Sequence, residues 1–532
     1  KRSSSELYSD LGQSKAKIYD DLMERHWDYW DDGSYLHLFV ADMAGRVTGG
    51  TDIMEGEPWD APLAPYFDAS EIAWNHAGTQ LAYTCKKLTG TQYALSTDSD
   101  IYLYDVASGR TSNLTEGMPG YDKYPVFSPD DSMIAFTSME RPGNESDKDR
   151  LFVMSLADGS KRYLTEGFDY NAGNVRWADD STLLFLSPIR ATIQLCSVSL
   201  SGGPVRVITS GAHDLNAFSA AGGRVVAEMT TLGSPTELFD VNPSDGAMTR
   251  ITNTNAEIYE RIRMGKVEER WVETTDGKRM LVWVVLPPDF DPSKKYPALL
   301  YCQGGPQSVV SQFWSYRWNL QLMAAQGYVV VAPNRRGVPS FGQEWLDQIS
   351  GDYSGQNIRD YLSAIDDVSA EPWVDRDRLG CVGASYGGYS VFFLAGNHQK
   401  RFKAFIAHCG MFNFESMYGA TEELWFPNND LGGPYWSDSP VARRSYANSP
   451  HKFVKNWDTP ILIFSGQRDF RIPYTESLQA FTAARLMGVP SRLVSFEDEA
   501  HQVFKPQNSL VWNREFFSWL DRYGKNAETP AE

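Results

Sequence analysis

The sequence is poor in cysteine, in long apolar runs and in clustered positive charge. Only five cysteines occur in 532 residues, and none belongs to a CxxC pair or another metal-binding spacing. An odd number spread so thinly excludes a disulfide scaffold, and we expect neither a metal site nor a cofactor. No apolar run reaches the ~18 residues of a membrane span. The opening residues, KRSSSELYSD, lack the apolar segment of a signal peptide.

The charge balance is acidic and the aromatic content is high. The net charge is −19, from 49 basic and 68 acidic residues, so a nucleic acid partner is not expected. The acidity indicates a solvated surface. The 16 Trp, 27 Tyr and 27 Phe are typical of β-rich folds and of pockets for apolar side chains. The length exceeds one ordinary core, so we expect more than one domain.

The first half of the chain repeats a pattern of short strands. The repeated segments, each a strand with an aromatic end, a polar turn and a second apolar strand, are EIAWNHAGTQLAYT, YPVFSPDDSMIAFTS, NVRWADDSTLLFLSP and NAFSAAGGRVVAEM. Two of them continue into near copies of each other, DIYLYDVASGRTSNLTEG and RLFVMSLADGSKRYLTEG. A repeat of ~40–50 residues with about four strands is typical of a propeller blade. We therefore predict a β-propeller over residues 1–258, with a β-sandwich of chance similarity as the alternative.

The repeats account for four blades and part of a fifth. The segment YLHLFVADMAGRVTGGTDI matches only the back half of a blade, and an open propeller would expose edge strands. We therefore expect a propeller that is truncated at its N-terminus. The preceding AKIYDDLMERHWDYWDDG is expected to be helical or irregular. Its Glu24, Trp27, Asp28 and Trp30 could line a cavity, but packing is the favoured interpretation.

Residues 259–532 show a different pattern, which predicts a second domain. Continuous apolar strands end in glycine-rich loops and alternate with helix-like segments; the strands are YPALLYCQGGP, GYVVVAPNRRG, RLGCVGASYGGY and TPILIFSGQRDF. This alternation predicts a mostly parallel sheet with helices on both faces, and functional groups on the loops after the strands. In the last helix one apolar face is formed by Trp512, Phe516, Trp519, Leu520 and Tyr523.

The stretch GASYGGY places Ser385 between a strand and a helix. A G-x-S-x-G motif in that context predicts a nucleophile elbow, whose strained turn requires neighbours without bulk. The serine needs a base and the base needs an orienting acid, each on a later loop. Asp469 and His501 follow two later strands in the expected order, with Glu497 and Glu499 as alternatives for the acid. Backbone donors for the oxyanion are expected at Tyr386 and Gly304.

These motifs carry a resemblance to a known family. The GGP loop, GASYGGY, GQRDFRIP and EAHQVF, in this order behind propeller repeats, resemble the prolyl oligopeptidase family of serine peptidases. The segment CGMFNFESMYGATEELWF further resembles its dipeptidyl-peptidase V and acylaminoacyl-peptidase branch. The resemblance implies an α/β-hydrolase domain behind the propeller, a triad of Ser385, Asp469 and His501, and a role for Arg471 in holding the carbonyl one residue before the cleaved one.

Two departures from the family concern substrate binding. Gln303 stands where dipeptidyl-peptidase IV relatives carry an oxyanion tyrosine, which favours backbone donation. The paired glutamates that bind the free amine of a substrate in those relatives have no clear counterpart. Candidates for an apolar pocket before the cleaved bond are Tyr386, Phe412, Phe414, Met417, Tyr418, Trp425 and Ile472.

The resemblance implies a peptidase that releases N-terminal dipeptides with an apolar residue before the cleaved bond. Its substrates would be short peptides, because the propeller caps the hydrolase and excludes folded proteins. An acylaminoacyl-peptidase or oligopeptidase, an esterase and a non-catalytic propeller scaffold are the alternatives. The resemblance is compatible with a homodimer and implies a periplasmic or secreted location.

Overall fold

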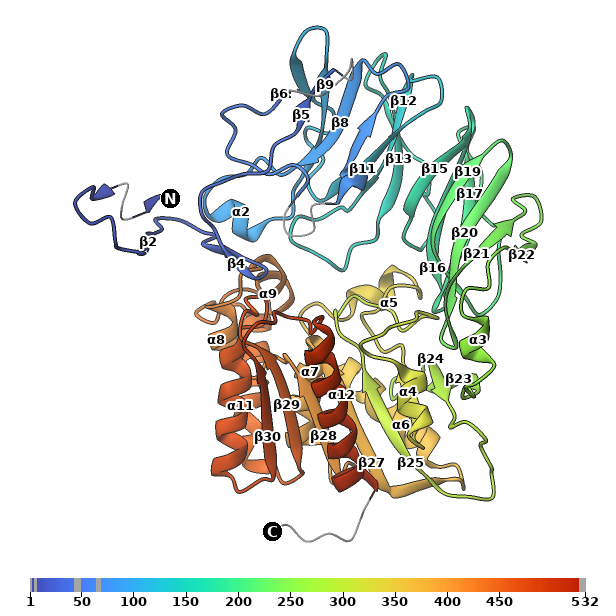
Figure 1. The fold of residues 1–532 in the computed structure, drawn as a ribbon, viewed down its shortest axis with the longest axis vertical. Coiled ribbons are helices and arrows are strands. Elements are labelled where there is room, and N and C mark those ends of the chain that lie inside the picture. The colour runs from blue at the N-terminus through green and yellow to red at the C-terminus, as the bar shows by residue number, and fades with distance from the viewer. Residues whose placement is uncertain (1, 4–6, 43–48, 64–67, 526–532) are drawn as a thin grey trace.

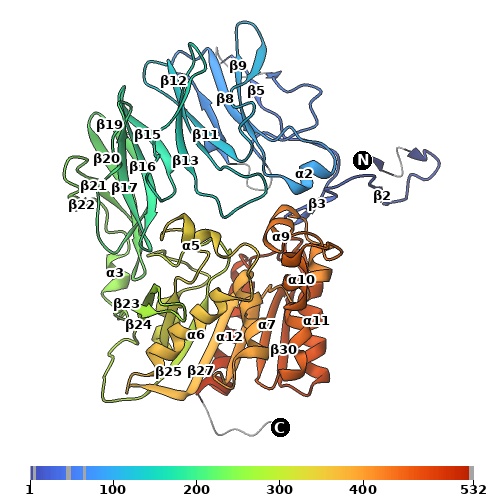
Figure 2. The same cartoon turned by 180° about the vertical axis from the view of Figure 1, so that it is seen from behind.

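The computed structural model describes residues 2–3, 7–42, 49–63 and 68–525, which form a strand-rich part beside an α/β part (Figures 1 and 2). The strand-rich part ends with β22 (Met248–Arg250), and the sheet of the α/β part begins with β23 (Val267–Glu273). Residue 258 lies between them in the short helix α3 (Ala256–Tyr259), and we propose it as the domain boundary.

The first two complete blades of the propeller are four-stranded antiparallel sheets. The first consists of β7 (Ile72–Trp74), β8 (Gln80–Cys85), β9 (Asp100–Asp105) and β10 (Arg110–Asn113). The second consists of β11 (Asp122–Phe127), β12 (Met133–Ser138), β13 (Arg150–Ser155) and β14 (Lys161–Tyr163). Two short helices, η1 (Ala69–Glu71) and α2 (Thr91–Leu95), lie in their connections.

Two further blades follow and are joined at one residue pair. The third blade consists of β15 (Gly173–Asp179), β16 (Thr182–Ile189), β17 (Thr192–Ser199) and β18 (Arg206–Val207). The fourth consists of β19 (Asp214–Ala221), β20 (Arg224–Thr231), β21 (Ser234–Val241) and β22. A parallel pairing of Ile193 with Asp214 connects the two. Neighbouring blades pack face to face, since Leu151 of one and Phe185 of the next share a buried apolar cluster.

The N-terminal segment departs from one expectation. The hairpin of β5 (Phe39–Val40) and β6 (Thr51–Asp52) precedes the first complete blade, and residues 43–48 of the predicted half blade lie outside the described residues. Residues 16–33, expected to be helical or irregular, contain no helix; they hold β2 (Lys17–Ile18), paired with β1 (Arg2–Ser3), and a hairpin of β3 (Arg25–His26) and β4 (Tyr29–Trp30). Trp27, with a φ of 55°, lies in the turn of that hairpin.

The α/β part contains one eight-stranded sheet in the order β23-β24-β26-β25-β27-β28-β29-β30. Its strands after β23 are β24 (Arg279–Val285), β25 (Tyr296–Cys302), β26 (Val329–Pro333), β27 (Val374–Ala384), β28 (Ala404–His408), β29 (Ile461–Gly466) and β30 (Ser491–Phe496). From β26 to β30 all neighbours pair in parallel, as the continuous apolar runs predict.

Helices cover both faces of this sheet. One buried cluster joins it to α6 (Gln356–Ser369), α7 (Tyr386–Asn397) and α11 (Tyr474–Leu486), and a second joins it to α4 (Leu320–Ala325) and α12 (Pro506–Leu520). The shorter elements are α5 (Gln343–Asp347), α8 (Phe414–Tyr418), α9 (Trp425–Asp430), α10 (Pro440–Ala447), η2 (Pro450–Asn456) and the terminal turn η3 (Asp521–Lys525).

The predicted fold class, a propeller followed by an α/β hydrolase, is confirmed. In the last helix, Trp512, Phe516, Trp519 and Leu520 are buried on one face, as their spacing predicts. Among the helices of the described residues, each is too short or too polar to cross a lipid bilayer. The carboxyl ends of the parallel strands face the propeller, so the loops that follow them lie between the two domains (Figure 1).

Candidate active site

Ser385 lies at the turn between β27 and α7 with a φ of 58° and a ψ of −121°. This left-handed φ is unfavourable for a residue with a side chain and is typical of a nucleophile elbow. The flanking glycines allow the close approach that the turn requires: a Cβ on Gly387 would lie 2.0 Å from the carbonyl oxygen of Cys302, and one on Gly383 would lie 2.7 Å from the same atom. Glycine is therefore required at both positions by backbone contact.

The structure brings Ser385 together with the two side chains predicted as its partners. His501 follows β30, and its Nε2 lies 2.9 Å from Oγ of Ser385. Asp469 follows β29, and its Oδ2 lies 2.7 Å from Nδ1 of His501. The backbone N–H of Ile472 donates to the other carboxylate oxygen of Asp469, which fixes the orientation of that side chain. The three groups thus form a continuous Ser–His–Asp hydrogen-bond chain.

Glu499, one of the two alternative acids, has other contacts. Glu499 accepts hydrogen bonds from the backbone N–H groups of Phe504 and Lys505 at the start of α12, so its carboxylate serves that helix end.

The charge of His501 depends on Asp469. Burial favours the neutral imidazole, but the Asp469 carboxylate and the Cys409 sulfur favour the cation, and the pKa of His501 is raised above its ordinary value.

Both residues predicted as oxyanion donors lie next to Ser385. Tyr386 is the first residue of α7, where the N–H groups have no partner within the helix. Gly304 lies in the loop after β25, and a Cβ built on it would lie 3.5 Å from Cβ of Ser385. The Gln303 side chain is held by Tyr301 and Ser308, since its Oε1 accepts from the tyrosine hydroxyl and its Nε2 donates to the serine.

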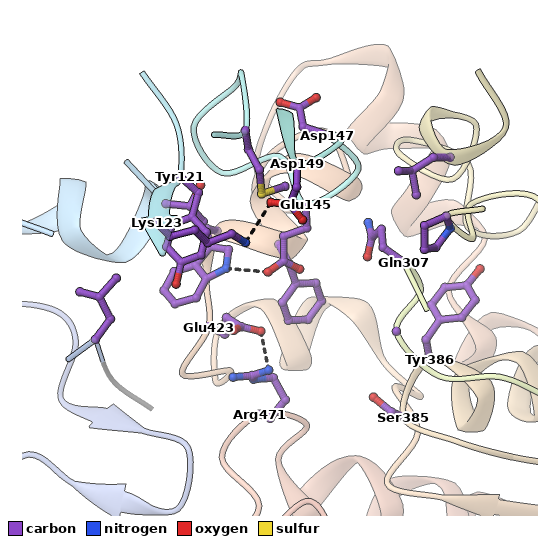
Figure 3. Close-up of a pocket in the computed structure, with 18 of the residues that line it drawn as sticks. Tyr121, Lys123, Glu145, Asp147, Asp149, Gln307, Ser385, Tyr386, Glu423 and Arg471 are labelled. Carbon is purple, nitrogen blue, oxygen red and sulfur yellow. Dashed lines mark hydrogen bonds and ion pairs between the residues drawn. The ribbon is translucent and has the colours of Figure 1, made fainter. Parts of the chain in front are cut away.

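A cavity of about 450 Å³ lies between the two domains and reaches Ser385 and His501. Of the residues predicted to bind substrate, Tyr386, Trp425, Arg471 and Ile472 line it. Figure 3 shows Ser385 and Tyr386 on one side of this cavity and Arg471 with Glu423 on the other. Its apolar wall also includes Met411 and Phe426, which directly neighbour predicted positions and were missed.

Four of the predicted pocket residues do not line the cavity. Phe412, Phe414, Met417 and Tyr418 are 3%, 1%, 0% and 5% exposed and belong to the buried cluster around α7. The ring of Phe412 packs against Phe392 of α7, for example. In this structure the four side chains therefore belong to the core of the hydrolase domain and not to the cavity wall.

Arg471 lines the cavity and is also paired with two carboxylates. Its Nε lies 2.6 Å from Glu422 and its Nη1 lies 2.7 Å from Glu423, both in the loop before α9. Its guanidinium carbon lies 4.9 Å from the ring centre of Trp27. The arginine is therefore fixed in place by its neighbours while its side chain remains at the cavity wall.

Carboxylates from both domains face the cavity near Arg471. Glu423 comes from the hydrolase domain, and Glu145, whose Oε1 accepts from the indole N–H of Trp425 at 3.3 Å, comes from the propeller (Figure 3). Burial raises the pKa of both carboxyls, and the nearby Arg471 opposes that rise. Both were missed in the sequence, although Glu423 belongs to the visible pair in TEELWF.

The N-terminal hairpin β3–β4 packs on the catalytic loops. The Trp27 ring meets the His501 imidazole edge to face at a centroid distance of 5.9 Å, and its carbonyl oxygen accepts from the N–H of Phe470 at 3.3 Å. Arg25 donates to the carbonyl oxygen of Ala420 at 2.7 Å. The favoured interpretation of this segment as packing fits Trp27, whereas Trp30, which meets Phe470 edge to face, is 48% exposed and lines a second cavity.

Comparison with known proteins identifies the family of the chain. The sequence model of the prolyl oligopeptidase family matches residues 314–527. Dipeptidyl-peptidase 5 of Porphyromonas gingivalis is 53% identical over 98% of this chain and 76% of its own length, and dipeptidyl-peptidase 5 of Porphyromonas endodontalis is 49% identical over 97% and 75%. Among solved structures, Pyrococcus horikoshii acylaminoacyl peptidase matches with a TM-score of 0.81 at 22% identity, over 97% of this chain and 78% of that one. The chain belongs to the prolyl oligopeptidase family of serine peptidases.

Proposed function

We propose that the chain is a dipeptidyl peptidase in which Ser385 is the nucleophile, His501 the general base and Asp469 the orienting acid. The observation that carries this proposal is the hydrogen-bond chain from Ser385 through His501 to Asp469 at 2.9 Å and 2.7 Å. Two relatives that are 53% and 49% identical to this chain over the aligned residues bear the name dipeptidyl-peptidase 5.

The reaction has two halves. His501 Nε2 takes the proton of Ser385 as Oγ attacks the peptide carbonyl, and the backbone N–H groups of Tyr386 and Gly304 stabilise the oxyanion. The imidazolium then gives its proton to the leaving amine, and an acyl-enzyme remains on Ser385. Water, activated by the same imidazole, hydrolyses the ester and releases the N-terminal fragment. Asp469 keeps Nδ1 protonated and stabilises the cation in both halves.

The release of dipeptides requires that the enzyme bind the free N-terminus of the substrate about two residues from the cleaved bond. Glu145, half-buried in the propeller, and Glu423, buried and paired with Arg471, offer carboxylates for an ammonium group at the far side of the cavity from Ser385. Arg471, held between Glu422 and Glu423, can grip the peptide carbonyl in between. An ammonium group would form charge-assisted hydrogen bonds with these carboxylates that an acylated amine cannot form, so they favour a free amine.

The residue before the cleaved bond is proposed to be apolar. The wall next to Ser385 is formed by aromatic and aliphatic side chains of Tyr386, Met411, Trp425, Phe426 and Ile472. Burial of an aliphatic or aromatic side chain there would contribute ~1.5–3 kcal/mol to binding. The propeller covers this cavity, so short peptides are the expected substrates and folded proteins are excluded (Figure 1).

Paired substrates test the proposal. Dipeptidyl p-nitroanilides with an apolar second residue are compared as free amines and as N-acetyl derivatives, with Ser385→Ala as the inactive reference. We expect cleavage of the free-amine substrate. Acetylation should lower kcat/KM by at least ~10-fold, since a charge-assisted contact of about 1.5–3 kcal/mol is lost. In Glu145→Gln, the ratio of kcat/KM for the free amine to kcat/KM for the acetylated substrate should be smaller. Faster cleavage of the acetylated substrate would make the chain an acylaminoacyl-peptidase instead.

The membership of the prolyl oligopeptidase family is also the basis for a proposal on location and assembly. We propose a periplasmic or secreted enzyme and allow for a homodimer. Fractionation of the source cells with an antibody to this chain tests the location, and light scattering of the purified protein tests the assembly.

A further inference from the structure

A cysteine lies beside the catalytic imidazole although no step of the reaction uses it. Cys409 follows β28 at the carboxyl edge of the sheet, is 2% exposed and has a φ of 42°. Its Sγ lies 3.9 Å from Nε2 of His501 and donates to the carbonyl oxygen of His501 at 3.4 Å. The thiol is thus next to the same nitrogen that accepts the proton of Ser385.

The groups around Nε2 have the chemistry and the spacing of zinc ligands. Among the described residues, Cys409, Asp469 and His501 hold ligand atoms that all lie within 4.8 Å of one another. Zinc binds sulfur at ~2.3 Å and imidazole nitrogen at ~2.0–2.1 Å, so two such ligands on a tetrahedral ion lie ~3.5 Å apart. The observed 3.9 Å between Sγ and Nε2 needs only a small adjustment. The hydroxyl of Ser385, 2.9 Å from Nε2, offers an oxygen on the cavity side.

Asp469 gives the imidazole the orientation that a metal ligand requires. Its carboxylate holds Nδ1 of His501 at 2.7 Å, which leaves the lone pair of the neutral ring on Nε2. A carboxylate in this position is what commonly supports a zinc-bound histidine from behind. Ser385 and His501 line the cavity, so an ion has a path to the site, whereas the sulfur closes it from the protein side.

We propose that Cys409 and His501, with the Ser385 hydroxyl on the open side, form an inhibitory site for Zn²⁺ and similar thiophilic divalent cations. On binding, the Cys409 thiol loses its proton to solvent and the thiolate and the neutral Nε2 each donate an electron pair to the ion. The ion then occupies the lone pair that would accept the Ser385 proton. The site is inhibitory because the base is blocked while the metal is bound, and it depends on the roles proposed above for Ser385 and His501.

Inhibition kinetics give the first test. Hydrolysis of a dipeptidyl p-nitroanilide by the whole chain is measured against buffered free Zn²⁺, with a chelator added afterwards to restore activity. We expect a fall in kcat with increasing free Zn²⁺, since the bound ion takes the lone pair of Nε2 that the chemical step needs. Removal of a supporting group alone costs roughly 10–100-fold in zinc affinity, so Cys409→Ala should raise the inhibition constant about 100-fold or more. Alanine has the same backbone preference as cysteine at a positive φ, so the fold should remain, and the inhibition of each variant is expressed relative to its own activity without zinc.

Two other cysteines give matched controls. Cys196 is buried in the propeller, and Cys381 lies beneath the elbow with its sulfur 3.7 Å from that of Cys302. Cys196→Ala and Cys381→Ala should leave zinc inhibition as in the unmodified chain. Equal inhibition of Cys409→Ala, or loss of inhibition in Cys381→Ala, would overturn the proposal. If Cys409→Ala does not fold, Cys409→Ser replaces it, and the inhibition constant for zinc should again rise.

A spectroscopic readout separates the metal site from the peptidase activity. Co²⁺ added to the unmodified chain without substrate should produce a thiolate-to-cobalt charge-transfer band in the near ultraviolet, and Zn²⁺ should abolish that band. The Cys409→Ala chain should give no band, and a band that persists would refute the site. If the unmodified chain cleaves no dipeptidyl substrate, the proposed function fails, but the cobalt band still decides whether the metal binds.

Discussion

Gly387→Ala is the sharpest single test of how the elbow is built. The added Cβ would lie 2.0 Å from the carbonyl oxygen of Cys302 and 2.9 Å from its carbon, and both are backbone atoms that no side-chain rotation can move. Real Cβ atoms essentially never approach closer than 3.0 Å, so the elbow or the end of β25 must shift. The required displacement is about 1 Å, which at a catalytic centre costs on the order of 10²-fold in rate.

The cost in stability follows from the same contact. Overpacking of a close contact typically costs about 1–3 kcal/mol, while alanine in a helix regains ~1 kcal/mol over glycine. Because the obstacle is backbone, we expect a net loss near 2 kcal/mol, which lowers the melting temperature by ~4–8 °C in a domain of this size. Gly419→Ala is the matched control, since its Cβ would lie 3.7 Å from the nearest atom, at a φ of −77°.

The assay combines thermal melting, kcat/KM on a dipeptidyl p-nitroanilide, and titration of reactive serines with a fluorophosphonate. Gly387→Ala should lose both rate and labelling, and Gly419→Ala should lose neither. A Gly387→Ala chain with kcat/KM within about twofold of the original and an unchanged melting temperature would refute the account of the elbow, because a displacement of this size costs ~10²-fold.

Three further predictions concern the triad and its arginine. Ser385→Ala should reduce turnover by a factor on the order of 10³–10⁶ with an unchanged melting curve, and retained activity of the purified variant would remove its proposed role. kcat/KM should rise with pH, because only neutral His501 accepts the proton; since Asp469 raises the pKa of His501, the midpoint should lie above its ordinary value and fall in Asp469→Asn, and a pH-independent rate would contradict this. Arg471→Ala should slow cleavage of dipeptidyl substrates by roughly 10–100-fold and hydrolysis of a small acetate ester by less, whereas equal losses would make the arginine purely structural. It should also lower the melting temperature, because Glu423 loses its cation.

The sequence predicts those parts of the site that depend on local backbone requirements. The glycines around Ser385 are needed because strand, turn and helix approach within contact distance of Cys302. Asp469 and His501 follow consecutive parallel strands, and such strand ends necessarily meet at one edge of the sheet. The repeat of apolar strands likewise predicts the blades, since each blade buries its faces against its neighbours.

The remainder of the site depends on contacts that have no sequence period. Glu145 reaches the cavity from a propeller loop, and Trp27 reaches His501 from the N-terminal hairpin. Their positions depend on how the domains are docked, which no local pattern encodes. Phe414 and Met417 lie in the core and not at the cavity wall, a distinction that the sequence does not make, because an apolar residue near an elbow fits a pocket and a core equally well. Only the direction in which α8 faces distinguishes the two, and that is set by packing against α7.

The contact of the β3–β4 hairpin with the catalytic loops bears on when the enzyme becomes active during its synthesis. Residues 25–30 are synthesised before the loops that carry Asp469 and His501. A hydrolase domain produced from residue 259 onward would keep its sheet and most of both apolar clusters but would have no Trp27 against His501 and no Arg25 on Ala420. Such a fragment should fold around its own core and still cleave poorly. On this reasoning, full activity requires that the two distant parts of the chain have met.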